Sequence, residues 1–213
     1  IIGTYTEINI IYSAGANGTI IGLSNEAIAI ADAVTVTQAN AVNSLTTEVV
    51  TANISDGDTA TLDGLIETGN AYTVTVTDAS VAASALNTLN AKTTGVVTVQ
   101  ATTITGKAAD INTVYAAGTA GTINGLGNED LMVNNSSIEA SILNSLDINS
   151  TGTIDASSIT ALSGTTYEIN SVYTSSGISG LGNEDLIVND SSIEASLLNS
   201  LDNNTTGTID ASS

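Results

Sequence analysis

The sequence contains no cysteine, histidine, arginine, proline, phenylalanine or tryptophan, and it has a single methionine. Without cysteine there is no disulfide framework and no thiolate metal site. Without histidine, cysteine or arginine there is also no imidazole base, thiolate nucleophile or guanidinium clamp. Carboxylates remain, but they recur with the sequence repeat described below, whereas an active site is a singular constellation. We therefore predict that the chain is not an enzyme and has no catalytic or cofactor-binding residues.

Positive charge is almost absent. There are 22 acidic residues and only two lysines, Lys92 and Lys107, which gives a formal net charge of −20. This charge repels nucleic-acid phosphates and anionic membrane surfaces, so we expect neither nucleic acid as a partner nor membrane insertion. No signal peptide, transmembrane run or lipidation motif is visible. Because the first residue is Ile rather than Met, we expect a processed chain or a piece of a longer one.

The missing proline and bulky aromatics shape the core that the chain can build. At ordinary usage of about 5%, a chain of 213 residues would carry about ten prolines. Hydrophobic residues still make up 42% of the sequence, and nearly all are Ile, Val, Leu and Ala. Small and β-branched side chains favour many thin repeated layers over one aromatic core.

A long internal repeat is the strongest feature that the sequence does have. Residues 125–158, GLGNEDLMVNNSSIEASILNSLDINSTGTIDASS, recur 55 positions later at 180–213, and 29 of the 34 aligned positions are identical. Near-identical tandem copies are typical of solenoids, in which each repeat buries its faces against its neighbours. A doubly wound α/β domain is the alternative, although it would not normally contain such copies.

Helices are predicted by two recurring patterns. The first, [D/E]-I-N-x-[I/V]-Y, spans 7–12, 110–115 and 168–173, and its apolar residues share one helical face. The second is Ser-x-x-Glu at 136–139 and 191–194, which we interpret as capping boxes that begin short helices. Residues 81–90 and 38–45 resemble weaker versions of that second helix.

Short β-branched runs lie between these helices and predict strands. Sequential strands joined by helices should be parallel, with right-handed crossovers. The predicted fold is therefore an α/β repeat, a β/α solenoid of short parallel strands alternating with short helices, with about two coils per 55-residue repeat. We divide the array into a divergent repeat at 1–57 and further repeats at 58–106, 107–164 and 165–213.

The two ends of the chain match the repeat when they are joined. GTIDASS at 207–213 followed by IIGTYTEINIIY at 1–12 aligns with GTIDASSITALSGTTYEINSVY at 152–173, with a three-residue deletion. No polar capping repeat is apparent at either end, and uncapped ends invite stacking. The expected partner is therefore the chain itself, as an end-to-end homopolymer or as a longer covalent array.

A candidate calcium loop occurs once in each of the two long copies. The spacing of oxygen ligands, with Gly at position 6 and Ile at position 8, resembles an EF-hand or dockerin loop, although position 12 is Ser in both copies. The interpretation that we prefer is a polar turn between helix and strand, because a tight calcium site needs more carboxylates. The candidate ligands are Asp147, Asn149, Thr151, Asp155, Asp202, Asn204, Thr206 and Asp210.

The Gly-Leu-Gly-Asn-Glu-Asp segments at 125–130 and 180–185 form a second acidic element, with a looser copy at 22–26. These segments would be able to lend oxygens to a calcium ion. The interpretation that we prefer is a turn that enters a strand and leaves its acids in solvent. The tyrosine that ends each [D/E]-I-N-x-[I/V]-Y pattern is expected to pack in the core or between coils.

The copies at 180–213 and AADINTVYAAGTAGTINGLGNED at 108–130 resemble repeats of giant secreted bacterial surface proteins, cyanobacterial ones included. The resemblance covers residues 58–213 well and 1–57 loosely, and it implies an adhesin-like or filament-forming protein at the cell surface. Two functions follow as expectations. The first is an extracellular filament or stalk built by end-to-end continuation of the solenoid. The second is a calcium-stabilised adhesin module that binds a surface or glycan ligand.

Overall fold

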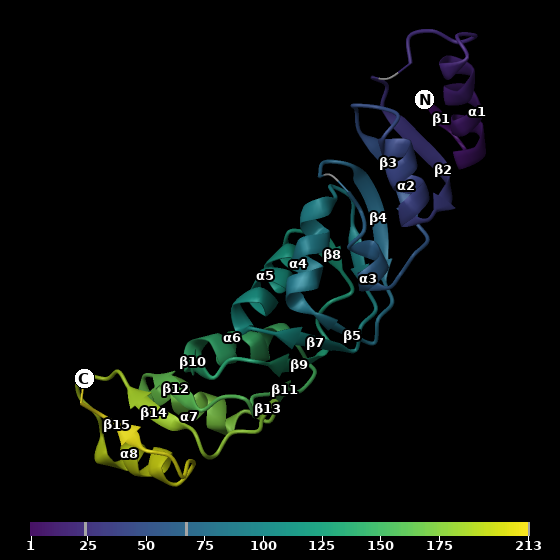
Figure 1. Cartoon of the computed structure of the whole chain (residues 1–213). Coiled ribbons are helices and arrows are strands. Elements are labelled where there is room, and N and C mark those ends of the chain that lie inside the picture. The colour runs from purple at the N-terminus through teal and green to yellow at the C-terminus, as the bar shows by residue number, and fades with distance from the viewer. Residues whose placement is uncertain (24, 67, 213) are drawn as a thin grey trace. The chain divides into compact units, whose positions relative to one another are not determined.

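The computed structural model describes residues 1–23, 25–66 and 68–212, and it has an α/β fold in which parallel strands alternate with helices. This confirms the predicted α/β class and the parallel direction of paired strands, as in the pairing of Ser137 with Ala161 and of Thr103 with Asp130, whereas the predicted solenoid stays a prediction. The chain divides into two compact units (Figure 1). The first unit comprises residues 1–81, 85–101 and 116–125, and the second comprises 82–84, 102–115 and the chain from 126 onward.

The first unit contains a six-stranded sheet in the order β1-β2-β3-β4-β6-β8. Its core is mostly aliphatic, because alternate residues of β3 and β4 are buried and, apart from Tyr72, those residues are Val, Ala and Ile. The strand bounds are β1 Ile2–Gly3, β2 Ile28–Val34, β3 Val50–Ile54, β4 Ala71–Val76, β6 Val97–Val99 and β8 Ile123–Asn124.

The second unit contains two parallel sheets. One includes the order β13-β11-β9-β7, and the other has the order β10-β12-β14-β15. The remaining strand is β5, Ser80–Ala82. The bounds in the second unit are β7 Thr103–Gly106, β9 Asp130–Val133, β10 Ser137–Glu139, β11 Ile154–Asp155, β12 Ala161–Gly164, β13 Ile178–Ser179, β14 Asp185–Val188 and β15 Ile209–Asp210.

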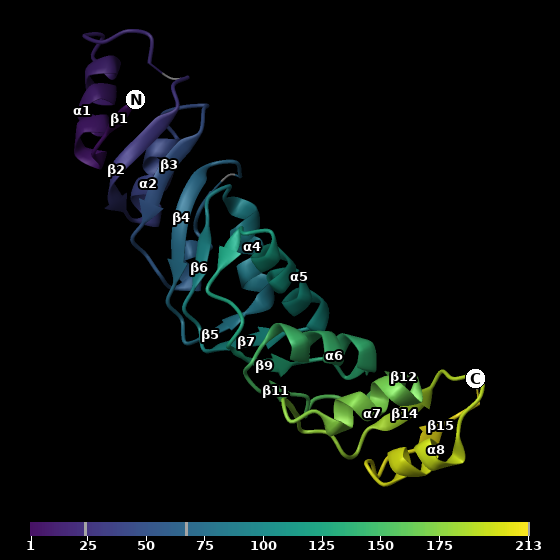
Figure 2. The same cartoon turned by 180° about the vertical axis from the view of Figure 1, so that it is seen from behind.

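The helices connect successive strands and pack beside one another. In the second unit α7 contacts both α6 and α8, and Figures 1 and 2 show these three helices in succession. In the first unit α1 contacts α2. The helices of the described chain are α1 Tyr5–Ala16, α2 Val36–Asn43, α3 Thr59–Leu62, α4 Ala83–Lys92, α5 Ala108–Thr119, α6 Ala140–Asn149, α7 Thr166–Thr174 and α8 Ala195–Asp202.

Paired strands come from segments about one strand and one helix apart. Ser137 pairs with Ala161, and Ala161 pairs with Asp185, so both steps are 24 residues. The next step, from Leu186 to Ile209, is 23 residues. We call the segment between a strand residue and its paired successor a coil. Two such steps are shorter than the 55-residue sequence repeat, and the expected number of about two coils per repeat stays a prediction.

The predicted capping boxes at 136–139 and 191–194 are wrong. Glu139 and Glu194 are themselves the N-cap residues of α6 and α8, and neither helix has a side-chain cap hydrogen bond. Ser136 lies instead directly before strand β10, whose three residues, Ser137 to Glu139, pair with the next coil. Tertiary pairing here overrides a local helix-start pattern.

Real capping boxes occur elsewhere, at Thr-x-x-Glu and Thr-x-x-Gln. In α1 the Thr4 side chain accepts a hydrogen bond from the Glu7 backbone, and the Glu7 carboxylate accepts one from the Thr4 backbone. The pair Thr165 and Glu168 begins α7 in the same way, and α2 uses Thr35 with Gln38. Because two orphan amides are satisfied at once, each box fixes where its helix starts.

Other predicted elements are confirmed with small shifts. The patterns at 7–12, 110–115 and 168–173 lie in α1, α5 and α7. The β-branched run after Val34 does not continue as strand, since Val36 begins α2. The four-residue helix α3 was not predicted, because it has no apolar periodicity and depends on the Asp58 side chain, which accepts a hydrogen bond from the Thr61 backbone.

The proposed division into repeats at 1–57, 58–106, 107–164 and 165–213 stays a prediction. No helix among the described residues is both long and apolar enough to cross a membrane.

Candidate interaction surfaces

The predicted calcium residues of the first copy lie on α6, on β11 and in the turn between them. Asp147 and Asn149 belong to the last turn of α6, and Asp155 lies in β11. The Asp147 carboxylate accepts a hydrogen bond from Ser175 Oγ at 2.8 Å, whereas Asp155 accepts one from the Ser157 backbone at 2.9 Å. The two acids therefore have separate partners, which suits the polar-turn interpretation.

The second copy repeats this arrangement in part. Asp202 is the last residue of α8 and is exposed, and Asp210 in β15 accepts a hydrogen bond from the Ser212 backbone at 3.0 Å. Thr206, like Thr151 in the first copy, donates its hydroxyl to a glycine carbonyl of the preceding coil. Within the described residues, no group of three or more acidic side chains is placed to hold a metal ion.

The glutamates of the acidic Gly-Leu-Gly-Asn-Glu-Asp segments are buried, so the prediction that these acids lie in solvent is wrong for Glu129 and Glu184, whereas it is confirmed for Asp130 and Asp185. Glu129 and Glu184 are both 0% exposed. The hydroxyl of Tyr115 donates to Glu129 Oε2 at 2.9 Å, and the hydroxyl of Tyr173 donates to Glu184. A buried carboxylate needs such donors because desolvation strongly disfavours an unpaired charge.

Backbone amides complete each of these sites. Gly127 donates its N–H to Glu129 Oε2 at 2.9 Å, and Gly182 donates to Glu184 Oε2 at 2.8 Å. The looser copy follows the same rule, since the hydroxyl of Tyr12 donates to Glu26 at 3.1 Å. Each Tyr–Glu pair therefore joins the end of a helix to the loop that enters the next strand.

Burial also changes the acidity of these tyrosines. Desolvation, with the hydrogen bond to Glu26, raises the pKa of Tyr12 to about 12. Burial likewise raises the pKa of Tyr115 and of Tyr173 above the ordinary value of 10.0, and the adjacent carboxylates contribute in both cases. The hydroxyls stay protonated at neutral pH and so remain donors.

A hydroxyl two residues before a glycine joins each coil to the one before it. Ser150 donates to the Glu129 carbonyl at 2.6 Å and accepts the Gly152 amide at 3.0 Å. Thr205 makes the same two contacts with Glu184 and Gly207, at 2.7 and 3.0 Å. These turns occupy the centre of the predicted calcium loops. In the fold they bind the backbone of one coil to that of the coil before it.

The glycine in these turns is required by close packing. A Cβ on Gly152 would lie 2.2 Å from the Glu129 carbonyl oxygen, and one on Gly207 would lie 2.3 Å from that of Glu184. Such distances are far inside van der Waals contact, so only glycine allows this approach of two backbones.

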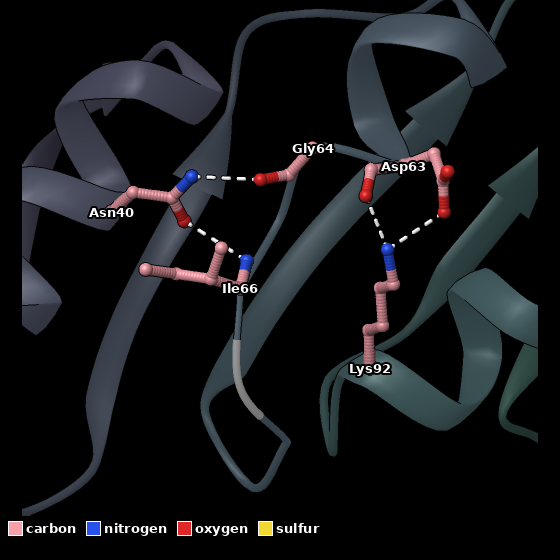
Figure 3. A network of polar contacts seen from close by, with 5 residues as sticks. All are labelled: Asn40, Asp63, Gly64, Ile66 and Lys92. Carbon is pink, nitrogen blue, oxygen red and sulfur yellow. Dashed lines mark hydrogen bonds and ion pairs between the residues drawn. The ribbon is translucent and has the colours of Figure 1, made fainter.

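Helix asparagines make a further contact between coils. The Asn144 amide in α6 donates to the Glu168 carbonyl in α7 at 3.0 Å. In the first unit Asn40 binds the following coil twice, donating to the Gly64 carbonyl at 2.8 Å and accepting the Ile66 amide at 3.1 Å (Figure 3). A single asparagine thereby satisfies backbone groups that no strand or helix pairs.

One of the two lysines also joins neighbouring segments of the first unit. The Lys92 ammonium at the end of α4 donates to the backbone carbonyl of Asp63 and forms an ion pair with its carboxylate at 2.7 Å (Figure 3). Because the Asp63 side chain is 71% exposed, water screens this pair and its contribution to stability is small.

A small-residue contact lies where each strand meets the helix of the preceding coil. A Cβ built on Gly164 would lie 3.2 Å from the Cβ of Ala140, the first residue of α6. Gly106 and Ala83 form the equivalent contact, at 3.5 Å. Ala83 and Ala140 are fully buried by these neighbours.

The helix α8 carries the same residues as α6 but leaves them uncovered. Ala195 and Asn199 occupy the positions of Ala140 and Asn144, and both are exposed. A shallow groove over this face is lined by Ala195, Leu198, Asn199, Asp202 and Ile209. We call this the α8 surface.

The helix α1 carries the matching half of the contact. Its sequence GTYTEINIIY at 3–12 aligns without gaps with GTTYEINSVY at 164–173, which begins at Gly164 and includes most of α7. A shallow groove over α1 has Asn9, Ile10 and Ala14 in its lining, and the neighbouring Ile2 is 82% exposed. We call this face, together with β1 and residues 19–21, the α1 surface.

The sequence indicated the repeat that produces these contacts but not the contacts themselves. The Tyr–Glu pairs were readable as a tyrosine followed 14, 14 and 11 residues later by glutamate at 12/26, 115/129 and 173/184. The spacing alone does not predict a pairing, because the two residues belong to segments that meet only in the folded chain.

No protein-family model, curated protein or solved structure matches this chain.

Proposed function

We propose that this chain is a non-enzymatic structural repeat protein that forms an extracellular filament or surface stalk, by end-to-end continuation of a β/α solenoid. The observation that carries the proposal is the recurrence of one set of contacts between successive coils. The set comprises strand pairing, the alanine–glycine contact, the helix asparagine and the hydroxyl–glycine turn. A solenoid is stabilised by such nearest-neighbour contacts, so each added coil extends it in the same way.

The two surfaces defined above support continuation. β1 is the first strand of its sheet and β15 is the last of its own, so each offers one unpaired edge within the described chain. Unpaired strand edges are templates for pairing with another chain. Because the α1 and α8 surfaces differ, their contact is heterologous, and heterologous contacts that do not close generate fibres.

The charge of the chain fits a protein that is elongated and well solvated. A net charge of −20 keeps separate filaments apart at low salt. In a saline medium the Debye length is about 8 Å, which weakens the repulsion between ends that approach each other. Calcium would act in this proposal as a screening ion on an acidic surface, with the candidate loops as its predicted contact points.

Electron microscopy of the purified chain tests the proposed function. The sample is compared in sodium chloride, in calcium chloride at matched ionic strength, and in chelator. Fibres in all three conditions are expected. Fibres only with calcium would favour the adhesin-like, calcium-stabilised alternative, and particles that stay monomeric at high concentration in every condition would overturn the filament proposal.

A further inference from the structure

We propose a specific docking register for two copies of this chain, which rests on the proposed function and adds the residues that make the contact. The α8 surface of one copy receives the α1 surface of the next, and α8 packs on α1 as α6 packs on α7. Three contacts carry the register: a strand pair, an alanine–glycine contact and an asparagine hydrogen bond. A fourth contact pairs an apolar residue of β15 with an apolar residue that follows α1 in the next copy.

The strand pair follows from β10 and β12. Ile138 pairs with Leu162 and Glu139 with Ser163, directly before α6 and α7 begin. Ile193 and Glu194 are the counterparts of Ile138 and Glu139, but in this chain they are not in a strand. When the end of one copy is joined to the start of the next, Ile1 and Ile2 align with Leu162 and Ser163. Because Glu139 pairs with Ser163, Glu194 of one copy would pair with Ile2 of the next.

The alanine–glycine contact fixes how closely the two copies approach. Gly164 and Gly106 each lie against an alanine of the preceding coil, whereas the nearest atoms to a Cβ on Gly3 belong only to its own helix, at Glu7 and Ile8. In the proposed register, Ala195 of the preceding copy takes the place of Ala140. A large side chain at position 195 would prevent this approach, since Ala140 leaves no room for more.

The asparagine contact sets the helix alignment. Asn144 binds the Glu168 carbonyl, and the corresponding residues are Asn199 in one copy and Glu7 in the next. Ile10, which is 63% exposed, stands at the position of Ser171 and becomes covered by α8 in this arrangement. Burying this side chain is favourable at about 25 cal/mol per Å² of apolar surface.

The far side of the contact uses β15. In the internal coils Ile154 pairs with Ile178 and Val97 pairs with Ile123. By the same register Ile209 pairs with Ile20 of the next copy. Ile123 is 1% exposed in its coil, whereas its counterpart Ile20 is 38% exposed in this chain, so docking would cover an apolar side chain that is otherwise partly in water.

Disulfide crosslinking tests the register, and the absence of native cysteine makes the result easy to interpret. The variant Glu194→Cys with Ile2→Cys is oxidised at the concentration at which fibres form. Paired strand residues lie within the Cα separation that a disulfide spans, about 4.4–6.8 Å. The expected result is a ladder of covalent oligomers on a non-reducing gel, which collapses to monomer when reductant is added.

Two matched variants control for chance. Glu139→Cys with Ser163→Cys places the same register inside one chain, and it should form an intrachain bond without a ladder. Glu194→Cys with Ile66→Cys joins the α8 surface to an exposed residue outside the α1 surface, and it should give no ladder. Equal ladders from the Ile66 and Ile2 variants would overturn the register.

Failure of the register is distinguishable from failure of the proposed function. Wild-type fibres without an Ile2 ladder would leave the filament in place and remove this docking. If neither fibres nor a ladder form, both proposals fail.

A bulky substitution provides a test that needs no oxidation. Ala195→Trp should reduce fibre mass at least tenfold and leave the melting temperature of the monomer unchanged, because Ala195 is exposed. Ser196→Trp, on a neighbouring exposed position outside the groove, should leave fibre formation unchanged. Equal fibre yields from the two variants would contradict the proposed contact.

Discussion

The copies at 125–158 and 180–213 are nearly the same sequence in two different surroundings. In the first copy Ile138 lies in strand β10 and Ala140 is fully buried, because the following coil covers both. In the second copy Ile193 is not in a strand and Ala195 is exposed. The helix nevertheless forms in both, as α6 and α8.

This comparison separates local from non-local causes. The helices recur because their apolar stripe and helix-forming residues are in the sequence. The strand β10 occurs only where a neighbouring strand supplies hydrogen bonds, since three residues of extended backbone have little stability alone. The predictions below substitute equivalent residues in the two copies, and they test which contributions to stability are local and which come from a neighbouring coil.

Core truncation should show the largest difference between the copies. Leu143 in α6 is fully buried, and its counterpart Leu198 in α8 is half-buried. Leu143→Ala should cost about 2–5 kcal/mol of unfolding free energy, because it removes buried methyl groups and leaves a cavity. Leu198→Ala should cost less than about 1 kcal/mol. Urea denaturation of both variants as monomers measures this, and equal losses would show that the second copy is covered in solution.

Removing a tyrosine hydroxyl should be costly in both copies, and more so in the first. Tyr115→Phe leaves Glu129 with the Gly127 amide as the donor to Oε2, while its other oxygen Oε1 has no hydrogen-bond donor among the described residues. We expect a loss of about 2–3 kcal/mol, typical of a hydrogen bond to a charged group. Tyr173→Phe should cost less, since Glu184 retains the amides of Gly182 and Asn183. Thermal unfolding at neutral pH distinguishes the two.

The same tyrosines predict a loss of stability in alkali. Their folded-state pKa lies above the ordinary value of 10.0, so their contribution is fully present below about pH 10 and is lost as pH rises through the folded-state pKa. For Tyr12 this window extends from 10.0 to about 12. Thermal unfolding followed between pH 8 and 12 should show a falling melting temperature. If the melting temperature of Tyr115→Phe fell with pH as steeply as that of the wild type, Tyr115 would not be a cause of the loss.

The turn glycines should behave alike in both copies, because each already touches the preceding coil. Gly152→Ala and Gly207→Ala should each destabilise the fold by about 1–3 kcal/mol through overpacking against a backbone carbonyl. Gly182→Ala is not a suitable control, since its φ of 134° disfavours any side chain. Ser176→Ala, at an exposed turn position, provides a neutral reference. If Gly207→Ala left the stability unchanged, the last coil would not pack against its predecessor as closely as the turn at Gly152 does.

Asparagine removal should separate folding from association. Asn144→Ala should cost about 1 kcal/mol of monomer stability, the usual contribution of one hydrogen bond. Asn199→Ala should leave monomer stability unchanged and slow fibre growth. Calorimetry and light scattering on the same samples measure the two effects, and a stability loss from Asn199→Ala would place that residue in an internal contact.

The smallest difference is expected for a pair of exposed acids. Asp130 accepts hydrogen bonds from the Thr153 backbone and hydroxyl, and Asp185 accepts the same pair from Thr208. These bonds lower the pKa of both carboxylates below 3.8, so their contribution is present above that pH and is lost as pH falls through the folded-state pKa. Acid unfolding of Asp130→Asn and Asp185→Asn should give matching midpoints, and a clear mismatch would show that the two turns differ.

Much of the fold could be read from the sequence because it depends on local periodicity. The Ile and Tyr spacing at 7–12, 110–115 and 168–173 predicted three helices, and the GTID segments predicted β11 and β15. The predicted capping boxes at 136–139 and 191–194 are wrong, whereas the boxes that begin at Thr4 and Thr165 have the same kind of pattern and are real. A Ser-x-x-Glu pattern alone cannot show whether a strand or a helix follows its serine.

The candidate surfaces needed the tertiary structure. By itself the sequence determined the repeat, the acidic charge, the helices and the parallel order, because these follow from composition and spacing. The burial of Glu129, the close approach of Gly152 to a carbonyl and the uncovered Ala195 were decided by which coil lies beside which. Identical residues become core or surface according to whether a neighbour removes them from water, and no single copy of the repeat carries that information.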